Sequence, residues 1–455
     1  MPLDQPPAQS WVTSNRPVPR LLVRPLREFL QTETAGGIVL LAATIVALGW
    51  ANSPWHGAYE GLWSTELSIR LGPFELAEDL RHWVNDGLMT VFFFVVGLEI
   101  KREMVAGDLR DFRSAALPII GAVGGMIVPA LLYWTLNSRG TGSAGWGIPM
   151  ATDIAFALGV LALFGPRVPS AVKVFVLTLA IVDDIGAILV IAIFYSGGIQ
   201  IPWLILASSL LVAVVALRFI GVWWLPSYVV LGIGVWLATY ESGIHATIAG
   251  VALGLLTPTQ AQAGSSLGKA SPGNEEDPDP STVQSISARA RASISVVERL
   301  EHALHPWASY LIVPTFALAN AGIALGSDVM TAAIGSSITL GVVVGLVVGK
   351  LSGIFGSAWL AHRLGFATLP EGVRWHHIGA AAAVAGIGFT VSIFIASLAF
   401  SDERLVDEAK IGVLAGSVLA TLLAAGILRL SGRSQIPSTP APSPDHQGEQ
   451  ERGDG

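Results

Sequence analysis

The sequence predicts an all-α polytopic membrane protein with about 12 transmembrane helices, two of them broken, and a small extramembrane β-hairpin. The composition is the first reason: 52% of the 455 residues are hydrophobic and only 13% are charged, against about 25% in ordinary soluble domains. The second reason is that long apolar runs, such as 36–50 and 339–349, recur along the whole chain. Lipid is therefore the expected solvent and main partner for most of the protein.

The apolar segments account for the predicted number of helices, because one crossing needs roughly 20 mainly apolar residues. They lie at 34–51, 80–104, 113–136, 145–164, 170–195, 200–219, 223–239, 243–257, 306–324, 336–360, 375–399 and 408–430. An even number of spans places both termini on one side. That side carries 20 of the 26 lysines and arginines, so both termini are expected in the cytoplasm.

The polar segments divide the chain. We expect a cytoplasmic arm at 1–28, a transmembrane domain at 29–432 and a disordered tail at 433–455. A Ser-, Pro- and acid-rich insertion at 258–296 interrupts the transmembrane domain and is predicted to be disordered. Alternating apolar residues on both sides of a Gly-Pro turn predict a β-hairpin at 66–77, with an irregular loop as the alternative.

Composition and motifs also exclude several kinds of chemistry. The chain has no cysteine, so disulfides, thiolate catalysis and cysteine metal sites are ruled out. The HExxH and GxSxG motifs are absent, so an enzyme is not expected. We expect neither a cofactor nor a nucleic-acid partner.

Two adjacent aspartates, Asp183 and Asp184, lie near the middle of the apolar run at 170–195. A charge at the centre of a span costs at least about 2.5–3.5 kcal/mol, so an acid kept there is expected to be functional. Neighbouring helical residues point about 100° apart, and both carboxyl groups can border one cavity. Such a pair holds either protons or a hard monovalent cation, and this competition predicts antiport. A structural pair satisfied by hydrogen bonds or a salt bridge is the alternative.

Asp153 and Lys350 are the other charges singled out inside predicted spans. Asp153 follows Thr152 and the helix-breaking Pro149, so its carboxylate is expected to neutralise the exposed N–H groups of a broken helix. An ordinary N-cap near the surface is the alternative. Lys350 lies too deep to reach the interface easily and needs a buried carboxylate or the carbonyl ends of a broken helix as partner.

A second break is predicted at Gly386 and Gly388, although small residues also mark tight helix packing. The two interrupted segments are the middle members of the triplets 3-4-5 and 10-11-12. This arrangement predicts inverted repeats with the ion site where the two broken helices cross. An acid would offset the paired positive helix ends and a base the paired negative ends, and Asp153 and Lys350 fit these roles.

The motifs around these residues resemble those of the NhaA family of sodium/proton antiporters. The matching strings are FFFVVGLEIKREM (92–104), IPMATDIAFALGVLALFG (148–165), LAIVDDIGAI (179–188), SGIHATIAG (242–250), RLEHALHPW (299–307) and GIGFTVSIFIASLAF (386–400). The resemblance covers roughly 24–430. It implies an electrogenic secondary transporter that exchanges intracellular Na+ or Li+ for external H+, is regulated by cytoplasmic pH, and serves sodium and pH homeostasis.

The resemblance also implies roles for single residues. Asp183 and Asp184 would form the ion and proton site, with Asp153 and Lys350 as charge compensators. A cytoplasmic pH-sensing cluster is implied at Glu99, Glu103, His245, Glu301, His302 and His305. The hairpin at 66–77 resembles the element through which family members form homodimers. Glu298 departs from the family pattern, because a lysine stands there in the best-known members.

Without the family, the sensor residues carry weaker signals. Glu99 and Glu103 share a helix face, which a solvated helix end with local ion pairs explains as well. Histidine titrates near physiological pH, but His302 and His305 also fit a plain helix start, and His245 fits packing as well as function. A cation channel and a sodium-coupled symporter for an organic solute are the rival functions. The channel would need a selectivity filter and the symporter a larger pocket.

Overall fold

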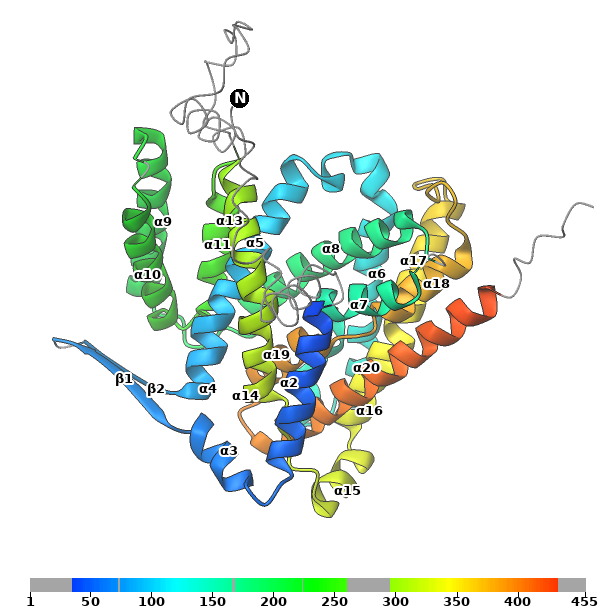
Figure 1. Cartoon of the computed structure of the whole chain (residues 1–455), viewed down its shortest axis with the longest axis horizontal. Helices are drawn as coiled ribbons and strands as arrows, with labels where there is room; N and C mark the ends of the chain where they lie inside the picture. The colour runs from blue at the N-terminus through cyan, green and yellow to red at the C-terminus, as the bar shows by residue number, and fades with distance from the viewer. Residues whose placement is uncertain (1–34, 73, 166–167, 223, 260–294, 433–455) are drawn as a thin grey trace, which may run out of the picture.

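The computed structural model describes residues 35–72, 74–165, 168–222, 224–259 and 295–432, and almost all of its elements are helices (Figure 1). The predicted arm at 1–28, most of the insertion at 258–296 and the tail at 433–455 lie outside these residues. The first half of the chain forms α2 (Ala35–Ala51), α3 (His56–Trp63), β1 (Glu66–Leu71), β2 (Phe74–Asp79), α4 (Leu80–His82), η3 (Trp83–Leu88), α5 (Met89–Val105), η4 (Asp108–Arg110), α6 (Phe112–Asn137), η5 (Thr141–Met150), α7 (Ile154–Leu163), α8 (Ser170–Phe194) and α9 (Ile201–Ile220). The second half forms α10 (Leu225–Glu241), α11 (Thr247–Leu256), α13 (Val296–Trp307), η7 (Ala308–Ile312), α14 (Val313–Asn320), α15 (Ser327–Gly335), α16 (Ser337–Val344), η8 (Gly345–Gly349), α17 (Lys350–Arg363), α18 (Trp375–Val384), α19 (Phe389–Ala399) and α20 (Glu403–Gly432).

The described helices match the lengths and hydropathy that a multi-pass membrane protein requires. Six are long and apolar enough to cross a membrane, and the number becomes nine if each of three bent helix pairs is one span. Every one of the twelve predicted segments contains helix in the described part of the chain. The number of twelve spans and the inverted repeats stay predictions.

The hairpin prediction is confirmed: β1 and β2 pair antiparallel, from Glu66 opposite Asp79 to Leu71 opposite Phe74. The hairpin projects away from the helices (Figure 1). Its base is attached to α10 through stacked rings, because Trp236 lies between Trp83 and Tyr240 at centroid distances of 6.1 and 6.0 Å. The Trp83 indole N–H also donates to the Leu67 carbonyl at 2.9 Å.

The helices form two packed groups. In one group, α6 packs along α8 and α17, and α20 packs against α16, α18 and α19. In the other group, α5 packs along α11 and α13, and α14 packs against α2. The pair α9–α10 stands at the edge of the molecule (Figure 1). The first group contains both broken helices and therefore the charges predicted inside the membrane.

Both predicted breaks are present. The first lies between the 3₁₀ helix η5 and α7, where residues 151–153 are extended and the axis bends by 48°. Pro149 near the end of η5 cannot donate a helical hydrogen bond, which agrees with a break at this point. The second break lies between α18 and α19, with a bend of 46°.

Candidate functional site

Asp183 and Asp184 lie in α8, which runs unbroken from Ser170 to Phe194, and they are only 1% and 5% exposed. Asp183 forms an ion pair with Lys350, whose Nζ lies 2.5 Å from Asp183 Oδ2. The side chains of both partners are completely buried. Asp184 makes no hydrogen bond or ion pair within the described part of the chain. The two carboxylates are therefore adjacent in sequence but differ in their partners.

Lys350 connects its ion pair with Asp183 to the two helix breaks. It is the first residue of α17 and follows the π-helical turn η8. Its ammonium also donates to the Thr152 hydroxyl at 3.0 Å. That hydroxyl in turn donates to the Ala385 carbonyl at 2.8 Å, at the C-terminal end of α18. The carbonyl end of one broken helix is thus linked through Thr152 to the lysine and then to Asp183.

Asp153 caps the N-terminal ends of two half-helices at once. Its Oδ1 accepts a hydrogen bond from the Phe156 amide at 3.0 Å, in the first turn of α7. Its Oδ2 accepts from the Thr390 amide at 3.1 Å and the Thr390 hydroxyl at 2.7 Å, in the first turn of α19. Exposed N–H groups at helix N-termini attract negative charge, so one carboxylate stabilises both ends. The Asp153 amide also donates to the Ile387 carbonyl at 2.7 Å, which holds the two breaks against each other.

The site combines two buried carboxylates with one buried ammonium. When both aspartates are ionised and Lys350 is protonated, the three groups carry one net negative charge, which a single monovalent cation neutralises. Asp183 Oδ1 is buried without a hydrogen-bond partner in the described part of the chain, and an unsatisfied buried oxygen is costly. Oxygen atoms of this kind are the ligands that hard cations prefer.

The structure thus brings Asp153, Asp183, Asp184, Lys350 and Thr152 together, although they come from three separate segments of the chain. Of the two partners considered for Lys350, the buried carboxylate is the direct one. The expectation that the lysine contacts carbonyl ends needs correction, since Thr152 lies between Lys350 and the Ala385 carbonyl. Sequence reasoning assigned no role to Thr390, and its position just after the Gly386–Gly388 break was the available signal.

The residues predicted to sense pH are only partly together. Arg102 forms ion pairs with Glu103, at 3.0 Å, and with Glu301 of α13. Glu301 is buried, and this burial raises the pKa of its carboxyl, partly offset by the Arg102 guanidinium. Glu99, one turn before Glu103, is an electrostatic neighbour of Glu301 and also of Asp184. Glu99 is therefore the member of this cluster that lies between Glu301 and the Asp183–Asp184 pair.

His245 lies away from this cluster. It immediately precedes α11, whose Gly250 packs against Thr90 near the start of α5, whereas Glu99 and Glu103 are near the other end of α5. A ring nitrogen of His245 lies 2.7 Å from the Tyr195 carbonyl at the end of α8. The resemblance implied that His245 groups with the carboxylates of α5, but the structure places His245 near the opposite end of that helix.

Three other residues of α13 have simpler surroundings. Glu298 completes a capping box: its amide donates to the Ser295 hydroxyl at 3.1 Å, and its carboxylate accepts from the Ser295 amide at 3.2 Å. A lysine could not make the second of these bonds. His302 and His305 are exposed. Within the described residues, no three histidine, aspartate or glutamate side chains are grouped to hold a metal ion.

The chain matches known proteins over nearly its whole length. Residues 27–428 match the model of the family described as Na+/H+ antiporter 1. The chain belongs to this family. It is 46% identical over 441 residues to the Na(+)/H(+) antiporter NhaA 3 of Frankia alni, covering 94% of this chain and 95% of that one. It is also 46% identical to the NhaA of Rhodopirellula baltica, over 424 residues that cover 91% and 95% of the two chains.

Membership of the antiporter family and the apolar helices together identify a multi-pass membrane protein. Family members are transporters. The sequence motifs that suggested the resemblance surround both breaks and the Asp183–Asp184 pair. The candidate site described above is thus built from the residues that carry the family pattern.

Proposed function

We propose that this antiporter exchanges intracellular Na+ or Li+ for external H+ at the Asp183–Asp184 pair. The supporting observation is the inequality of the two buried carboxylates: Lys350 neutralises Asp183, and Asp184 has no polar partner in the described part of the chain. Asp184 must therefore be either protonated or next to a cation. Because the same oxygen atoms serve both ions, binding of one displaces the other.

We further propose that Lys350 contributes to the proton count. A cation bound between the two carboxylates competes with the lysine ammonium for Asp183. Loss of that ion pair would favour release of the Lys350 proton in addition to the proton on Asp184. Two protons per sodium ion make the exchange electrogenic, so the membrane potential can drive sodium export. The alternative is that Lys350 is only a structural counter-charge.

Cytoplasmic pH is proposed to act through Glu99, Glu103 and Glu301 with Arg102. Ionisation of these carboxyls changes the charge near Asp184, because Glu99 interacts electrostatically with both Glu301 and Asp184. His302 and His305 would contribute from the surface of α13. No direct contact supports the participation of His245.

The setting proposed for this activity is the bacterial inner membrane, with both termini in the cytoplasm and roles in sodium and pH homeostasis. The distribution of lysine and arginine supports this orientation. The hairpin at 66–77 is proposed to mediate homodimerisation, which its projection from the helices would permit (Figure 1). No cofactor is proposed.

The decisive experiment measures sodium-driven proton movement in proteoliposomes for wild type and Asp184→Asn. We expect saturable exchange, driven against the sodium gradient by an imposed pH gradient, and its loss in Asp184→Asn. Glu75→Gln on the exposed hairpin is the matched control and should retain exchange. Robust exchange by Asp184→Asn would overturn the site, and an uncoupled current would indicate a channel instead. Uptake of an organic solute with sodium would indicate a symporter.

A further inference from the structure

Two adjacent histidines, His376 and His377, lie in the first turn of α18, and their ring centroids are 4.1 Å apart. His377 is only 8% exposed, although the predicted orientation places this end of α18 on the cytoplasmic side. Within the described part of the chain, no carboxylate forms a hydrogen bond or ion pair with either ring. The pair therefore has no acidic partner, unlike the arginine and glutamate cluster around Arg102.

His377 completes the helix cap of α18 with its own ring. The Arg374 amide donates to His377 Nδ1 at 3.2 Å, and the His377 amide donates to the Arg374 carbonyl at 2.9 Å. Because an amide N–H can only donate, Nδ1 must be unprotonated when this bond forms. The residue that accepts this N–H in a capping box is ordinarily glutamate or glutamine. Histidine titrates near neutral pH, so this cap is lost when Nδ1 takes up a proton.

The surroundings of His377 oppose its protonation. A positive ring would lie at the N-terminal end of α18, where the helix dipole is also positive, and beside Arg374 and His376. The helices that pack on α18 are α7, α8, α17 and α20, and α7 carries no charged residue. In the predicted orientation, the cytoplasmic ends of the other three carry Lys173 of α8, His362 and Arg363 of α17, and Arg429 of α20. Glu371, in the loop before α18, is exposed. The uncharged ring is therefore the form that fits the cap.

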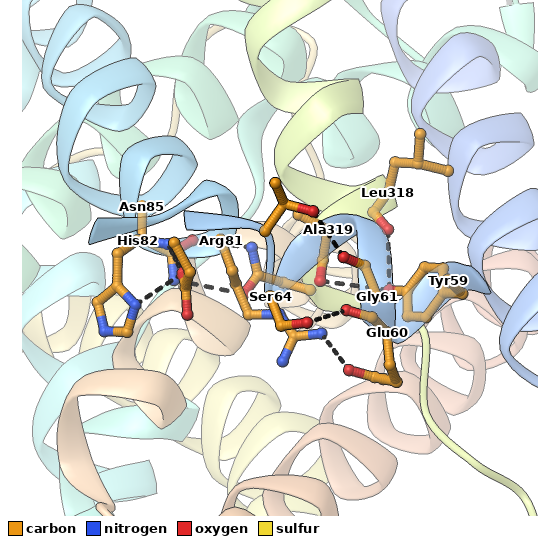
Figure 2. A network of polar contacts seen from close by, with 12 residues as sticks. Tyr59, Glu60, Gly61, Ser64, Arg81, His82, Asn85, Leu318 and Ala319 are labelled. Carbon is orange, nitrogen blue, oxygen red and sulfur yellow. Dashed lines mark hydrogen bonds and ion pairs between the residues drawn. The ribbon is translucent and has the colours of Figure 1, made fainter. Parts of the chain in front are cut away.

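His82, at the start of α4, shows the opposite arrangement (Figure 2). Its ring Nδ1 lies 2.8 Å from Asp79 Oδ1, and the same oxygen accepts from the His82 amide at 2.7 Å. There a carboxylate is the cap, and protonation of the ring would strengthen its contact with that carboxylate. In α18 the histidine itself is the cap, so protonation removes the acceptor instead.

Aromatic packing attaches the start of α18 to α17. The Trp375 ring contacts those of Phe355 and His362, at centroid distances of 5.6 and 5.5 Å. A Cβ at Gly379, one turn further along α18, would lie 3.9 Å from the Phe355 ring. Because α17 begins with Lys350, the helix that supplies the lysine also supports the first turn of α18.

The other end of α18 reaches the candidate ion site. From His377 to Ala385 the helix rises about 12 Å. The Ala385 carbonyl accepts from the Thr152 hydroxyl at 2.8 Å, and that hydroxyl accepts from Lys350 at 3.0 Å. A Cβ at Gly386 would lie 2.4 Å from the Leu346 carbonyl, so the break is in close contact with η8. A shift of α18 along its axis therefore changes the contacts of Thr152 and, through them, those of the lysine.

We propose that His377 is a pH-sensitive cap, and that its protonation at acidic cytoplasmic pH loosens the first turn of α18 and slows ion exchange. This inference rests on the proposed exchange and orientation, and it adds a second element to the proposed regulation by pH. With an uncharged ring, the cap and Trp375 hold α18 against α17 and keep the Ala385 carbonyl on Thr152. With a protonated ring, the Arg374 amide loses its acceptor, and the Arg374 guanidinium repels the ring.

His377→Gln tests the proposal directly, because glutamine accepts the same N–H and does not titrate. The measurement is the rate of sodium-driven proton movement in proteoliposomes over a range of pH. We expect the maximal rate to stay within about twofold of wild type. The pH at which the rate falls to half its maximum should move toward acid by about half a unit or more. His377→Leu removes the acceptor at every pH and should slow exchange about threefold even at alkaline pH, the size expected from loss of one helix cap.

His376→Gln is the matched control. It removes the neighbouring imidazole, which accepts no hydrogen bond within the described residues. Without the positive charge that His376 carries at acidic pH, His377 is easier to protonate, so the half-maximal pH should move slightly toward alkali. A shift toward acid of equal size in His376→Gln and His377→Gln would overturn the special role of Nδ1. A half-maximal pH that His377→Gln leaves unchanged would overturn the proposal as a whole.

Amide hydrogen exchange, followed by mass spectrometry in detergent, tests the cap without any transport. Wild type and His377→Gln are compared at the same pH, so that the intrinsic pH dependence of amide exchange cancels. At about pH 8 the segment 374–384 should exchange equally in the two proteins, and at about pH 5.5 it should exchange about threefold faster in wild type.

Wild type alone provides a further comparison, because α11 contains no titratable residue. Exchange at 374–384 relative to exchange at 247–256 should rise as the pH falls. Equal exchange of 374–384 in wild type and His377→Gln at acidic pH, or a constant ratio in wild type, would overturn the pH-sensitive cap. Because these measurements require no ion exchange, their outcome is independent of the Asp184→Asn assay.

Discussion

Two sets of carboxylates in this protein differ in their burial and in the donors that surround them. Near the end of α5, Glu103 and Glu301 share the Arg102 guanidinium, and Glu103 also accepts from the Asp108 amide at 3.1 Å. In the middle of α8, Asp183 and Asp184 are more deeply buried and have only Lys350 as an ionic partner. Glu103 has several donors, whereas Glu301 and Asp183 each keep one oxygen buried without a partner, and Asp184 has no donor at all, within the described residues.

We expect this difference to distinguish carboxylates that stabilise the fold from carboxylates that exchange ions. A carboxylate with several fixed donors gains little from binding a further ion, whereas a dry carboxylate without donors requires a proton or a cation. A transported ion must also leave again, so the site cannot be filled by permanent partners. Four substitutions test this comparison, in order of decreasing expected effect.

Asp183→Asn should have the largest effect, because it removes the proposed ion ligand and the partner of Lys350 together. We expect exchange in proteoliposomes to fall by at least about a hundredfold, corresponding to about 2.7 kcal/mol or more. The matched variant Glu103→Gln lies in the donor-rich set and should retain exchange at alkaline pH. Comparable loss in both variants would abolish the distinction between the two sets.

Lys350→Met should destabilise the protein, because Asp183 is then left as an uncompensated buried charge. Breaking a buried ion pair costs roughly 3–5 kcal/mol, which thermal unfolding in detergent would detect. The double variant Asp183→Asn/Lys350→Met removes both charges and should recover part of that loss. Additive destabilisation in the double variant would show that the two side chains do not interact.

Asp153→Asn should have an intermediate effect. The amide oxygen can still cap one half-helix, but the amide NH2 cannot accept from Thr390, and the charge that stabilises two helix N-termini is lost. We expect a loss of about 1–2 kcal/mol in thermal stability with residual exchange. A stability equal to wild type would mean that the carboxylate is not needed where the breaks meet.

Glu301→Gln should have the smallest effect, confined to pH dependence. Burial raises the pKa of Glu301, so the folded protein holds this proton more tightly than the unfolded chain does. The group therefore favours folding below its unfolded pKa, and that contribution is lost as pH rises through the folded pKa. Between the unfolded and folded pKa values, the thermal stability of the variant should fall less steeply with rising pH than that of wild type. Its exchange should also become active at a shifted pH. Identical pH profiles for both proteins would remove Glu301 from regulation.

Much of the fold could be predicted because lipid imposes simple rules on a sequence. Runs of apolar residues marked the helical segments, and Pro149, Gly386 and Gly388 marked the breaks. The hairpin could be predicted because apolar residues alternate with polar residues around Gly72. The burial of Lys410 could not be predicted, because this residue looks like an ordinary charge near a helix end. Only the folded structure shows that it is 8% exposed.

The sequence by itself determined that lipid surrounds most of this protein. It also determined which charged residues are energetically costly to place inside the membrane. An aspartate pair within an apolar run is costly to place in lipid, so Asp183 and Asp184 could be identified without a structure. Only the tertiary structure decided how the two differ. Lys350 is 167 residues from Asp183 along the chain and 198 from Thr152, and no local pattern indicates which oxygen atoms its ammonium reaches. That choice depends on where two broken helices meet, and their meeting depends on packing over the whole helix group.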